Sequence, residues 1–432
     1  MRNLSYSFLL FCTLLGATSL QATHNVAGEI LYRKTGPLTV EAWIVTYSKA
    51  SSVNADRDSL TICWGDGLCE TVLRTNGNGE GEIVAPDRKR NVYLGTHTYL
   101  AAGQYNIYLT DPNRISGILN VNAPSSDNIP FHLQSTVSFL AGAAASAASP
   151  VLLEYPLDDG MVGQPFEHLV NAFDADGDSL AYELVVPMQG ENALAPNYQF
   201  PTEIMPGSNN TLTLDPVSGK IVWDAPQKAG YYTITILIKS YRNGQVVETI
   251  LRDMLINIAP DDGFNQAPVV QMSVPDGSVI DVQAGDAVQV DVTVSDPNAG
   301  QTPEISSSSA LYDQFQQAAG FTVDAQGVGH FTWNVLPEQV REQPYLVVFK
   351  AKDQVNSGAG LASFKVAVFR VSQTTAVRPG PAEAAALRVY PNPATGDAQV
   401  EIPATVTGNL RLRVLNEQGA IVQEEEIPAG TS

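Results

Sequence analysis

Basic residues are scarce in this sequence: 24 Lys and Arg face 45 Asp and Glu, which gives a formal net charge of −21. A surface of that sign repels a phosphate backbone, so nucleic acid is excluded as a partner. There are five histidines, and the sequence has no Gly-Xaa-Ser-Xaa-Gly, no His-Glu-Xaa-Xaa-His and no phosphate-binding loop. These absences favour a protein that is not an enzyme. A glycoside hydrolase stays open as the least favoured class, because paired carboxylates leave no sequence signature.

Long apolar runs are also missing, apart from residues 8–20 near the N-terminus. That run is too short to span a bilayer, and it follows the positively charged start Met1-Arg2-Asn3. This pattern predicts a secretory signal peptide over residues 1–22, cleaved after Ser19 or Ala22. We therefore expect an exported protein.

Cysteine is nearly absent, and removal of the signal peptide leaves only Cys63 and Cys69. The two residues flank Trp64-Gly65-Asp66-Gly67, a turn sequence between two apolar strands. In an oxidising compartment this arrangement predicts a disulfide across the end of a hairpin. The alternative is a two-cysteine metal site, but no histidine or further cysteine lies close enough in sequence to complete it.

Period-two alternation of apolar residues is present along most of the mature chain. Examples are Thr39–Val45, Tyr231–Ile236 and Phe364–Phe369, with Gly, Pro, Asn and Asp between such segments. This pattern is typical of antiparallel strands with one buried face. We predict an all-β fold of tandem antiparallel immunoglobulin-like β-sandwiches in a multidomain rod, with one short helix within residues 308–319.

An internal repeat defines the middle of the chain. Ser149-Pro150-Val151-Leu152, Phe173–Asp178 and Gly219–Trp223 are echoed in the same order by Ala267-Pro268-Val269-Val270, Val294–Asn298 and Gly329–Trp333. The offset of about 110 to 120 residues predicts two copies of one sandwich. We assign them to residues 149–262 and 263–372, and we expect Trp223 and Trp333, which occupy the same repeat position, to lie in the two cores.

The segment before the repeats has a different pattern. Ile62-Cys63-Trp64-Gly65-Asp66-Gly67 and His97-Thr98-Tyr99 resemble the polycystic kidney disease (PKD) domain, which implies a PKD-like β-sandwich over residues 23–148. More widely, Thr23–Ile30, Thr110–Arg114, Phe173–Asp178 and Arg252-Asp253-Met254 occur in the same order in large Bacteroidetes surface proteins linked with gliding motility and adhesion. That resemblance covers roughly residues 23–260.

The C-terminal segment carries a third resemblance. After a Pro/Ala-rich linker over residues 373–386, Tyr390-Pro391-Asn392-Pro393 and two alternating strands joined at 416–419 resemble the type A sorting domain of the type IX secretion system. The resemblance implies export through an outer-membrane translocon and a secreted, outer-membrane-associated cell-surface location. Because the sequence stops at Gly430-Thr431-Ser432, we expect residues 387–432 to form a partial sorting domain.

Asp174, Asp176 and Asp178 are the first candidate metal ligands. Alternation on an extended segment sends the three carboxylates to one side, where Ca²⁺, which takes six to eight oxygens, would neutralise them. The nearest further carboxylates are those of Glu154, Asp158 and Asp159. The alternative is a turn in which Asp bonds to the backbone and Gly adopts a positive φ. In the second copy, Asp291, Asp296 and Asn298 are the counterparts.

Together these observations predict a secreted surface protein for adhesion or structural support, with sandwich junctions stiffened by Ca²⁺. Its glycan or protein ligand is not specified by the sequence. The alternative is a carbohydrate-binding accessory protein for polysaccharide capture. For that function Trp64 is the candidate ligand-stacking residue, since a position at a turn favours exposure.

Overall fold

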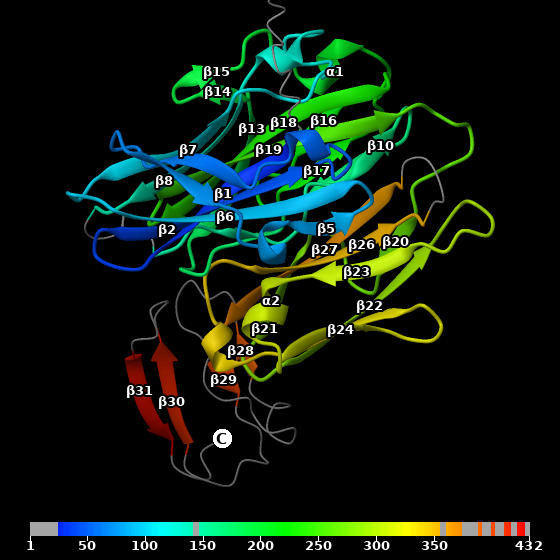
Figure 1. Cartoon of the computed structure of the whole chain (residues 1–432). Coiled ribbons are helices and arrows are strands. Elements are labelled where there is room, and N and C mark those ends of the chain that lie inside the picture. The colour runs from blue at the N-terminus through cyan, green and yellow to red at the C-terminus, as the bar shows by residue number, and fades with distance from the viewer. Residues whose placement is uncertain are drawn as a thin grey trace, which may run out of the picture. The chain divides into compact units, whose positions relative to one another are not determined.

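The computed structural model describes residues 25–140, 147–354, 360–373, 388–390, 399–401, 410–415 and 421–427 (Figure 1). The predicted signal peptide, its cleavage site and almost all of the predicted linker lie outside these residues. The chain divides into two compact units, Met1–Gln373 and Thr374–Ser432. Most described elements are strands, and most of their pairings are antiparallel, which confirms the predicted all-β fold class.

The first described segment contains eight strands and the disulfide-bearing hairpin. Its strands are β1 (Asn25–Lys34), β2 (Thr39–Ser48), β3 (Ser59–Cys63), β4 (Cys69–Leu73), β5 (Glu82–Ala85), β6 (Arg88–Thr98), β7 (Gln104–Asp111) and β8 (Phe131–Ser138). Alternate side chains of these strands, including Leu60, Ile62 and Ile107, form one buried cluster. The period-two pattern in the sequence therefore corresponds to one buried face per strand.

The first repeat follows with short strands and one long hairpin. Its elements are β9 (Val151–Leu152), β10 (Asp159–Met161), β11 (Phe166–Leu169), β12 (Ala172–Phe173), β13 (Ser179–Val185), β14 (Met188–Gly190), β15 (Ala193–Leu194), α1 (Pro201–Ile204), β16 (Leu212–Leu214), β17 (Lys220–Trp223), β18 (Gly230–Arg242) and β19 (Gln245–Ala259). Strands β18 and β19 pair along almost their whole length.

Strand β19 also joins the first repeat to the N-terminal strands. It pairs with β1 and β8 in a 12-stranded sheet of order β4-β3-β7-β8-β19-β1-β2-β6-β5, with β10 and β18 pairing β19, and β13 pairing β18, off this path. Two buried ion pairs involve β19: Arg252 contacts Glu29 at 3.1 Å, and Asp253 contacts Arg114 at 2.6 Å. Backbone pairing thus crosses the predicted boundary at 148/149, and the domain division itself stays a prediction.

The second repeat is a sandwich of two four-stranded sheets. Its elements are β20 (Val269–Met272), β21 (Val279–Gln283), β22 (Ala287–Ser295), β23 (Glu304–Ser308), α2 (Ala310–Gln314), β24 (Ala319–Val323), β25 (Gly329–Asn334), β26 (Tyr345–Lys352) and β27 (Ala362–Ser372). The sheets have the orders β20-β22-β25-β24 and β21-β27-β26-β23. Their inner faces enclose an aromatic core in which the Trp333 ring packs edge-on against Tyr345 and Phe369.

Two smaller expectations are also confirmed. Helix α2 lies within residues 308–319, and Ser309 begins it by accepting a hydrogen bond from the backbone N–H of Leu311 at 3.3 Å. Trp223 and Trp333 are each 1% exposed, as expected for core residues.

Side chains of the first repeat enter the cores of the second. Phe173, at the end of β12, belongs to the cluster formed by the β22, β25, β26 and β27 side chains. Leu169, at the end of β11, packs with Val348, Phe364 and their neighbours. The loop that follows Phe173 carries the predicted aspartates, so the packing of Phe173 fixes that loop beside the second repeat.

The C-terminal unit shows two strand pairs. They are β28 (Arg388–Tyr390) with β29 (Gln399–Glu401), and β30 (Leu410–Leu415) with β31 (Ile421–Ile427). The Pro391-Asn392-Pro393 motif and the 416–419 turn lie outside the described residues, so the sorting domain stays a prediction. Among the helices that the structure describes, none has the length and apolar character needed to cross a membrane.

Candidate metal centre

The disulfide prediction is confirmed at the end of the β3–β4 hairpin. Cys63 and Cys69 are opposite one another in the register of the two strands, and their sulfur atoms are 2.02 Å apart. The bond closes the Trp64-Gly65-Asp66-Gly67 turn. It therefore supports the hairpin rather than a metal site.

The expectation that Trp64 is exposed is wrong. Trp64 is 1% exposed, and its ring stacks on His97 with centroids 5.0 Å apart. The reason is strand alternation: Leu60, Ile62 and Trp64 point to the same buried side, and the turn begins only after Trp64. A buried indole offers no stacking face to a sugar, so Trp64 is not a ligand residue.

The Asp174–Asp178 loop connects β12 to β13 and gathers its three carboxylates. One oxygen from each of Asp174, Asp176 and Asp178 lies within 4.8 Å of the others. The loop also has the turn chemistry of the alternative prediction, because Asp174 Oδ1 accepts hydrogen bonds from the backbone N–H groups of Asp176 (2.8 Å) and Asp178 (3.3 Å). Gly177 has a φ of 88°, which favours glycine.

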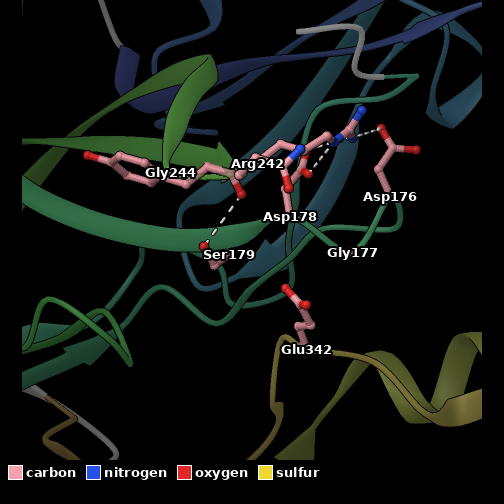
Figure 2. A pocket seen from close by; sticks show the side chains of 9 residues that line it. Asp176, Gly177, Asp178, Ser179, Arg242, Gly244 and Glu342 are labelled. Carbon is pink, nitrogen blue, oxygen red and sulfur yellow. Dashed lines mark hydrogen bonds and ion pairs between the residues drawn. The ribbon is translucent and has the colours of Figure 1, made fainter. Parts of the chain in front are cut away.

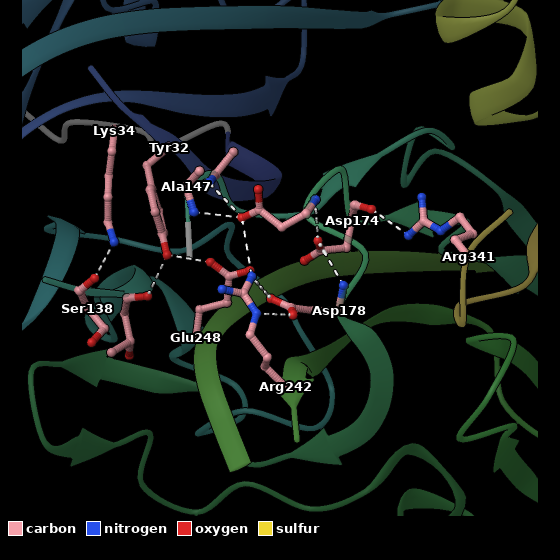
Figure 3. A network of polar contacts seen from close by, with 12 residues as sticks. Tyr32, Lys34, Ser138, Ala147, Asp174, Asp178, Arg242, Glu248 and Arg341 are labelled. Atoms are coloured by element: carbon pink, nitrogen blue, oxygen red, sulfur yellow. Dashed lines mark hydrogen bonds and ion pairs between the residues drawn. The ribbon is translucent and has the colours of Figure 1, made fainter. Parts of the chain in front are cut away.

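Arg242, the last residue of β18, provides the main positive charge beside the Asp174–Asp178 loop (Figure 3). Its guanidinium donates to Asp178 Oδ1 at 2.6 Å and to Asp178 Oδ2 at 2.8 Å, and it lies 3.7 Å from Asp176. Asp176 Oδ2 also accepts from the backbone N–H groups of Ala147 and Ala148 at 2.6 and 3.2 Å. Asp178 is therefore already neutralised by the protein.

Glu248, on β19, completes the cluster and was not predicted. Glu248 is 1% exposed and Asp174 is 0% exposed. Tyr32, on β1, donates its hydroxyl to Glu248 Oε2. The carboxyl of Glu248 also interacts by hydrogen bonding with the carboxyl of Asp174 and with the hydroxyl of Ser240, which faces Glu248 in the β18–β19 register.

The two buried carboxyls disfavour each other's charge. Burial, aided by the charge of Asp174, raises the pKa of Glu248 to about 8. Burial, aided by the charge of Asp178, also raises the pKa of Asp174. A buried carboxylate pair is stable only if a proton or a cation compensates it, so this pair has the electrostatics of a cation site.

Three parts of the chain meet at this cluster. Tyr32 and Lys34 come from β1, Glu248 and Arg242 from the first repeat, and Arg341 from the second repeat (Figure 3). Arg341 donates to the backbone carbonyl of Asp174 at 2.7 Å, and its guanidinium lies over the Phe173 ring at 4.4 Å. An ion bound at this cluster would lie where β1, the first repeat and the second repeat meet, rather than within one sandwich.

An open polar pocket of about 570 Å³ borders the loop. Figure 2 shows Asp176, Asp178 and Arg242 on one side and Glu342 of the second repeat on the other. The pocket gives solvent and small ions access to the outer edge of the aspartate loop.

The second predicted group is only partly brought together. Asp291 lies in β22, five residues before Asp296. Five residues of extended strand separate two positions by about 16 Å. The carboxylate of Asp291 contacts His330 at 2.8 Å instead. The grouping of Asp291 with Asp296 and Asn298 is therefore wrong, whereas Asp296 and Asn298 are close, since Asp296 Oδ1 accepts from the Asn298 backbone N–H at 2.7 Å.

The partner of Asp296 is Asp353, at the end of β26, which sequence reasoning missed. Asp353 is 5% exposed, and it accepts from Asn265 Nδ2 at 2.9 Å. Burial and then the charge of Asp296 raise the pKa of Asp353 to about 6. Within the described ranges, Asp353 Oδ1, Asp296 Oδ2 and Gln301 Oε1 are buried without a hydrogen-bond partner.

Both repeats thus contain a close carboxyl pair, fully buried in the case of Asp174 and Glu248, whereas in the second repeat Asp353 is buried and Asp296 is half-buried. The sequence signal that could have identified Glu248 and Asp353 is an acidic residue within an apolar strand or directly after one, because such a residue stays buried only with a compensating partner. The further carboxylates named from the sequence lie elsewhere: Asp158 contacts Lys350 and His168, and Glu154 accepts from Ser308.

No family model matches this chain, and no curated protein matches it. Similar solved structures include the titin domains z1z2 in complex with telethonin (13% identity, TM-score 0.18, covering 52% of this chain and 98% of that chain). Others are the tandem Ig repeats of Dlar (15%, 0.22, 52% and 98%) and PcdhgB3 EC1-4 (15%, 0.19, 82% and 72%). At these TM-scores the matches say nothing about function.

Proposed function

We propose that this protein is a non-enzymatic adhesion or structural protein of the cell surface, in which Ca²⁺ stiffens the junctions of the sandwiches. The observation that carries the proposal is that each repeat holds two close carboxyls, both buried in the Asp174–Glu248 pair and one buried and one half-buried in the Asp353–Asp296 pair. Such a pair is unfavourable at neutral pH unless it is protonated or binds a metal ion.

The available atoms fit a hard cation. The first cluster offers Asp174 Oδ2, Glu248 Oε1 and Ser240 Oγ, and the second offers Asp296 Oδ2, Asp353 Oδ1 and Gln301 Oε1. All six are oxygens, which Ca²⁺ prefers, and backbone carbonyls or water would supply the remaining ligands. In the first cluster Asp174 and Glu248 are the proposed ligands, because Arg242 already neutralises Asp178.

Thermal unfolding of the mature chain with excess Ca²⁺ and with chelator tests the metal. At a calcium concentration of 100 times Kd, binding adds about 2.7 kcal/mol per site, which raises the melting temperature by several degrees. Asp174→Asn and Asp353→Asn should each remove part of the increase. The matched control Asp281→Asn alters an exposed carboxylate that pairs with Arg370 outside both clusters, and it should leave the increase intact.

Calorimetric titration with Ca²⁺ then separates the two clusters. The proposal expects two binding events in the wild-type chain and one in each of the two Asn variants. A chain that shows no calcium-dependent heat and no change in melting temperature would refute the metal. The adhesion role would then stand as a proposal without calcium.

Export to the cell surface rests on the N-terminal and C-terminal segments. We propose that the secretion translocon recognises residues 387–432. A fluorescent reporter that carries this segment, expressed in a host with the type IX pathway, should appear in the medium or on the surface. Retention of the reporter inside the cell would contradict this part of the proposal.

The alternative function, polysaccharide capture, rested on an exposed Trp64. Its burial removes that observation. An array of glycans probed with the mature chain measures whether sugar binding exists at another surface.

A further inference from the structure

A lysine and an aspartate are in direct contact where the two repeats meet. Lys350 lies on β26 of the second repeat, and Asp158 immediately precedes β10 of the first. The ammonium nitrogen is 2.6 Å from Asp158 Oδ1, and the aspartate side chain is 1% exposed. The contact therefore joins two segments that are far apart in sequence, away from solvent.

The contact is an ion pair at hydrogen-bond distance. Lys350 Nζ lies 2.6 Å from Asp158 Oδ1. The other oxygen, Oδ2, is 2.8 Å from His168 Nδ1. Because a carboxylate only accepts, the proton of that bond lies on Nδ1, and it polarises the carboxyl group.

A second carboxylate lies within reach of the same nitrogen. Glu154 Oε2 is 3.8 Å from Lys350 Nζ, and Ser308 donates its hydroxyl to Glu154 Oε1. The nitrogen thus has one carboxylate in contact and a second one, 3.8 Å away, that must come about 0.6 Å closer to accept a proton from it.

Apolar groups surround the pair. The Phe364 ring lies 4.9 Å from Lys350 Nζ, and Leu169 and Val348 are buried in the same cluster. Burial alone would lower the pKa of Lys350, but the charges of Asp158 and Glu154 and the hydrogen bond to Asp158 together outweigh burial, and the pKa lies above its usual value. The pair therefore rests as two ions whose desolvation is costly, and a neutral product would remove that cost.

We propose that Lys350 and Asp158 join in an intramolecular amide bond that covalently ties the first repeat to the second. Lys350 Nζ transfers a proton to Glu154, and its lone pair attacks Asp158 Cγ to form the C–N bond. Oδ2 carries the developing negative charge while His168 donates to it. The bond from Cγ to Oδ1 breaks, and that oxygen leaves as water with two protons that came from the ammonium group.

The reaction balances without a further reagent. The ammonium and the carboxylate together contain every atom of the amide and of the water released, and no atom changes oxidation state. The cross-link would act on the junction independently of Ca²⁺, because neither Lys350 nor Asp158 belongs to the two carboxyl pairs.

Mass spectrometry of the full chain tests the proposal. The folded, disulfide-reduced protein should be lighter than its sequence by the mass of one water. After denaturation, trypsin should leave the peptide bond after Lys350 uncut, and that peptide should be joined to the one that contains Asp158. An unshifted mass together with two separate peptides would mean an ion pair only, and it would overturn the proposal.

Variants separate the chemistry from folding. Asp158→Asn should release ammonia instead of water and give a product of the same mass as cross-linked wild type. Glu154→Ala should fold but keep its full mass, because the proton acceptor is missing. Lys220→Met, which removes the Lys220–Glu167 pair from the same interface, is the matched control and should still lose one water. Loss of water in Glu154→Ala would overturn the role of Glu154.

Discussion

Two clusters of buried charge in the first repeat differ in how that charge is balanced. At Asp158, the Lys350 ammonium lies 2.6 Å away and brings one positive charge to one carboxylate. At Asp174 and Glu248, two carboxyls face each other, while the nearby guanidinium of Arg242 binds Asp178. The Asp158 cluster is balanced by the protein itself, whereas the Asp174–Glu248 cluster needs a proton or a cation from the solution.

The largest expected effect comes from removing the positive charge beside Asp158. Lys350→Met leaves the Asp158 carboxylate buried without its cation, which should cost about 3 to 5 kcal/mol of unfolding free energy. Urea denaturation followed by tryptophan fluorescence measures the loss. Asp158→Asn in the Lys350→Met background should recover the part of the loss that comes from the buried charge, whereas any part that comes from the missing cross-link should remain. A loss no larger than that of Lys220→Met would show that the cluster is not effectively buried.

The free energy of unfolding should depend on pH through the Asp174–Glu248 cluster, in the direction set by the raised pKa of Glu248. Between the ordinary Glu value of 4.5 and about 8, folded Glu248 holds a proton that unfolded Glu248 has lost. Stability in chelator is therefore fully present below pH 4.5 and falls, by an estimated few kcal/mol, as pH rises toward 8.

Glu248→Gln should flatten that dependence and stabilise the calcium-free protein at pH 8. Chemical denaturation in chelator at pH 5, 6.5 and 8 measures both effects. Glu183→Gln changes an exposed glutamate that pairs with Lys239, and it serves as the control. If the wild-type curve does not fall between pH 5 and 8, the Asp174–Glu248 pair is not compensated by a proton.

The disulfide gives a reference that involves neither cluster. Because it closes a short loop, Cys63→Ser combined with Cys69→Ser should cost about 2 kcal/mol. Thermal and urea unfolding of the double variant measure this loss under non-reducing conditions. The loss should be the same with calcium and with chelator. A calcium-dependent loss would indicate that the stability of the hairpin is coupled to the Asp174–Glu248 or the Asp296–Asp353 pair.

The smallest effect is expected at the exposed Arg370–Asp281 pair. Both side chains are more than half exposed, so solvent screens their attraction. Asp281→Asn should leave the unfolding free energy unchanged within error at every pH between 5 and 8. A clear loss would mean that surface charge, and not only buried charge, controls the stability of this acidic chain.

Much of the fold could be predicted from periodicity. The alternation of apolar residues located strands, and Trp223 and Trp333 are buried as expected from their shared position in the internal repeat. The sharing of β19 by the N-terminal strands and the first repeat could not be predicted, because pairing between β1 and β19 joins residues whose sequences carry no mark of each other. Local pattern determines strands, whereas distant partners are chosen by the whole core.

The candidate site was predictable only in its local part. The Asp174–Asp178 spacing indicated a carboxylate cluster, and the three carboxylates do converge. Glu248 and Asp353 come from distant strands, so no spacing rule includes them. Trp64 was predicted to be exposed because the turn sequence after it was given more weight than the alternation that begins at Leu60. Asp291 was grouped with Asp296 and Asn298 because the similarity between the two copies was extended beyond the loop that follows β22.

The shared strand β19 has a consequence for how the chain folds as it emerges. Strand β1 begins at Asn25, and its residue Gly28 lies opposite Asp253 of β19. The edge of β1 that pairs with β19 therefore has no partner until more than half of the chain has been synthesised. Such long sequence separation slows folding and leaves an open strand edge that invites aggregation. During folding, strand β1 therefore needs protection from other chains until residues 245–259 are available to pair with it.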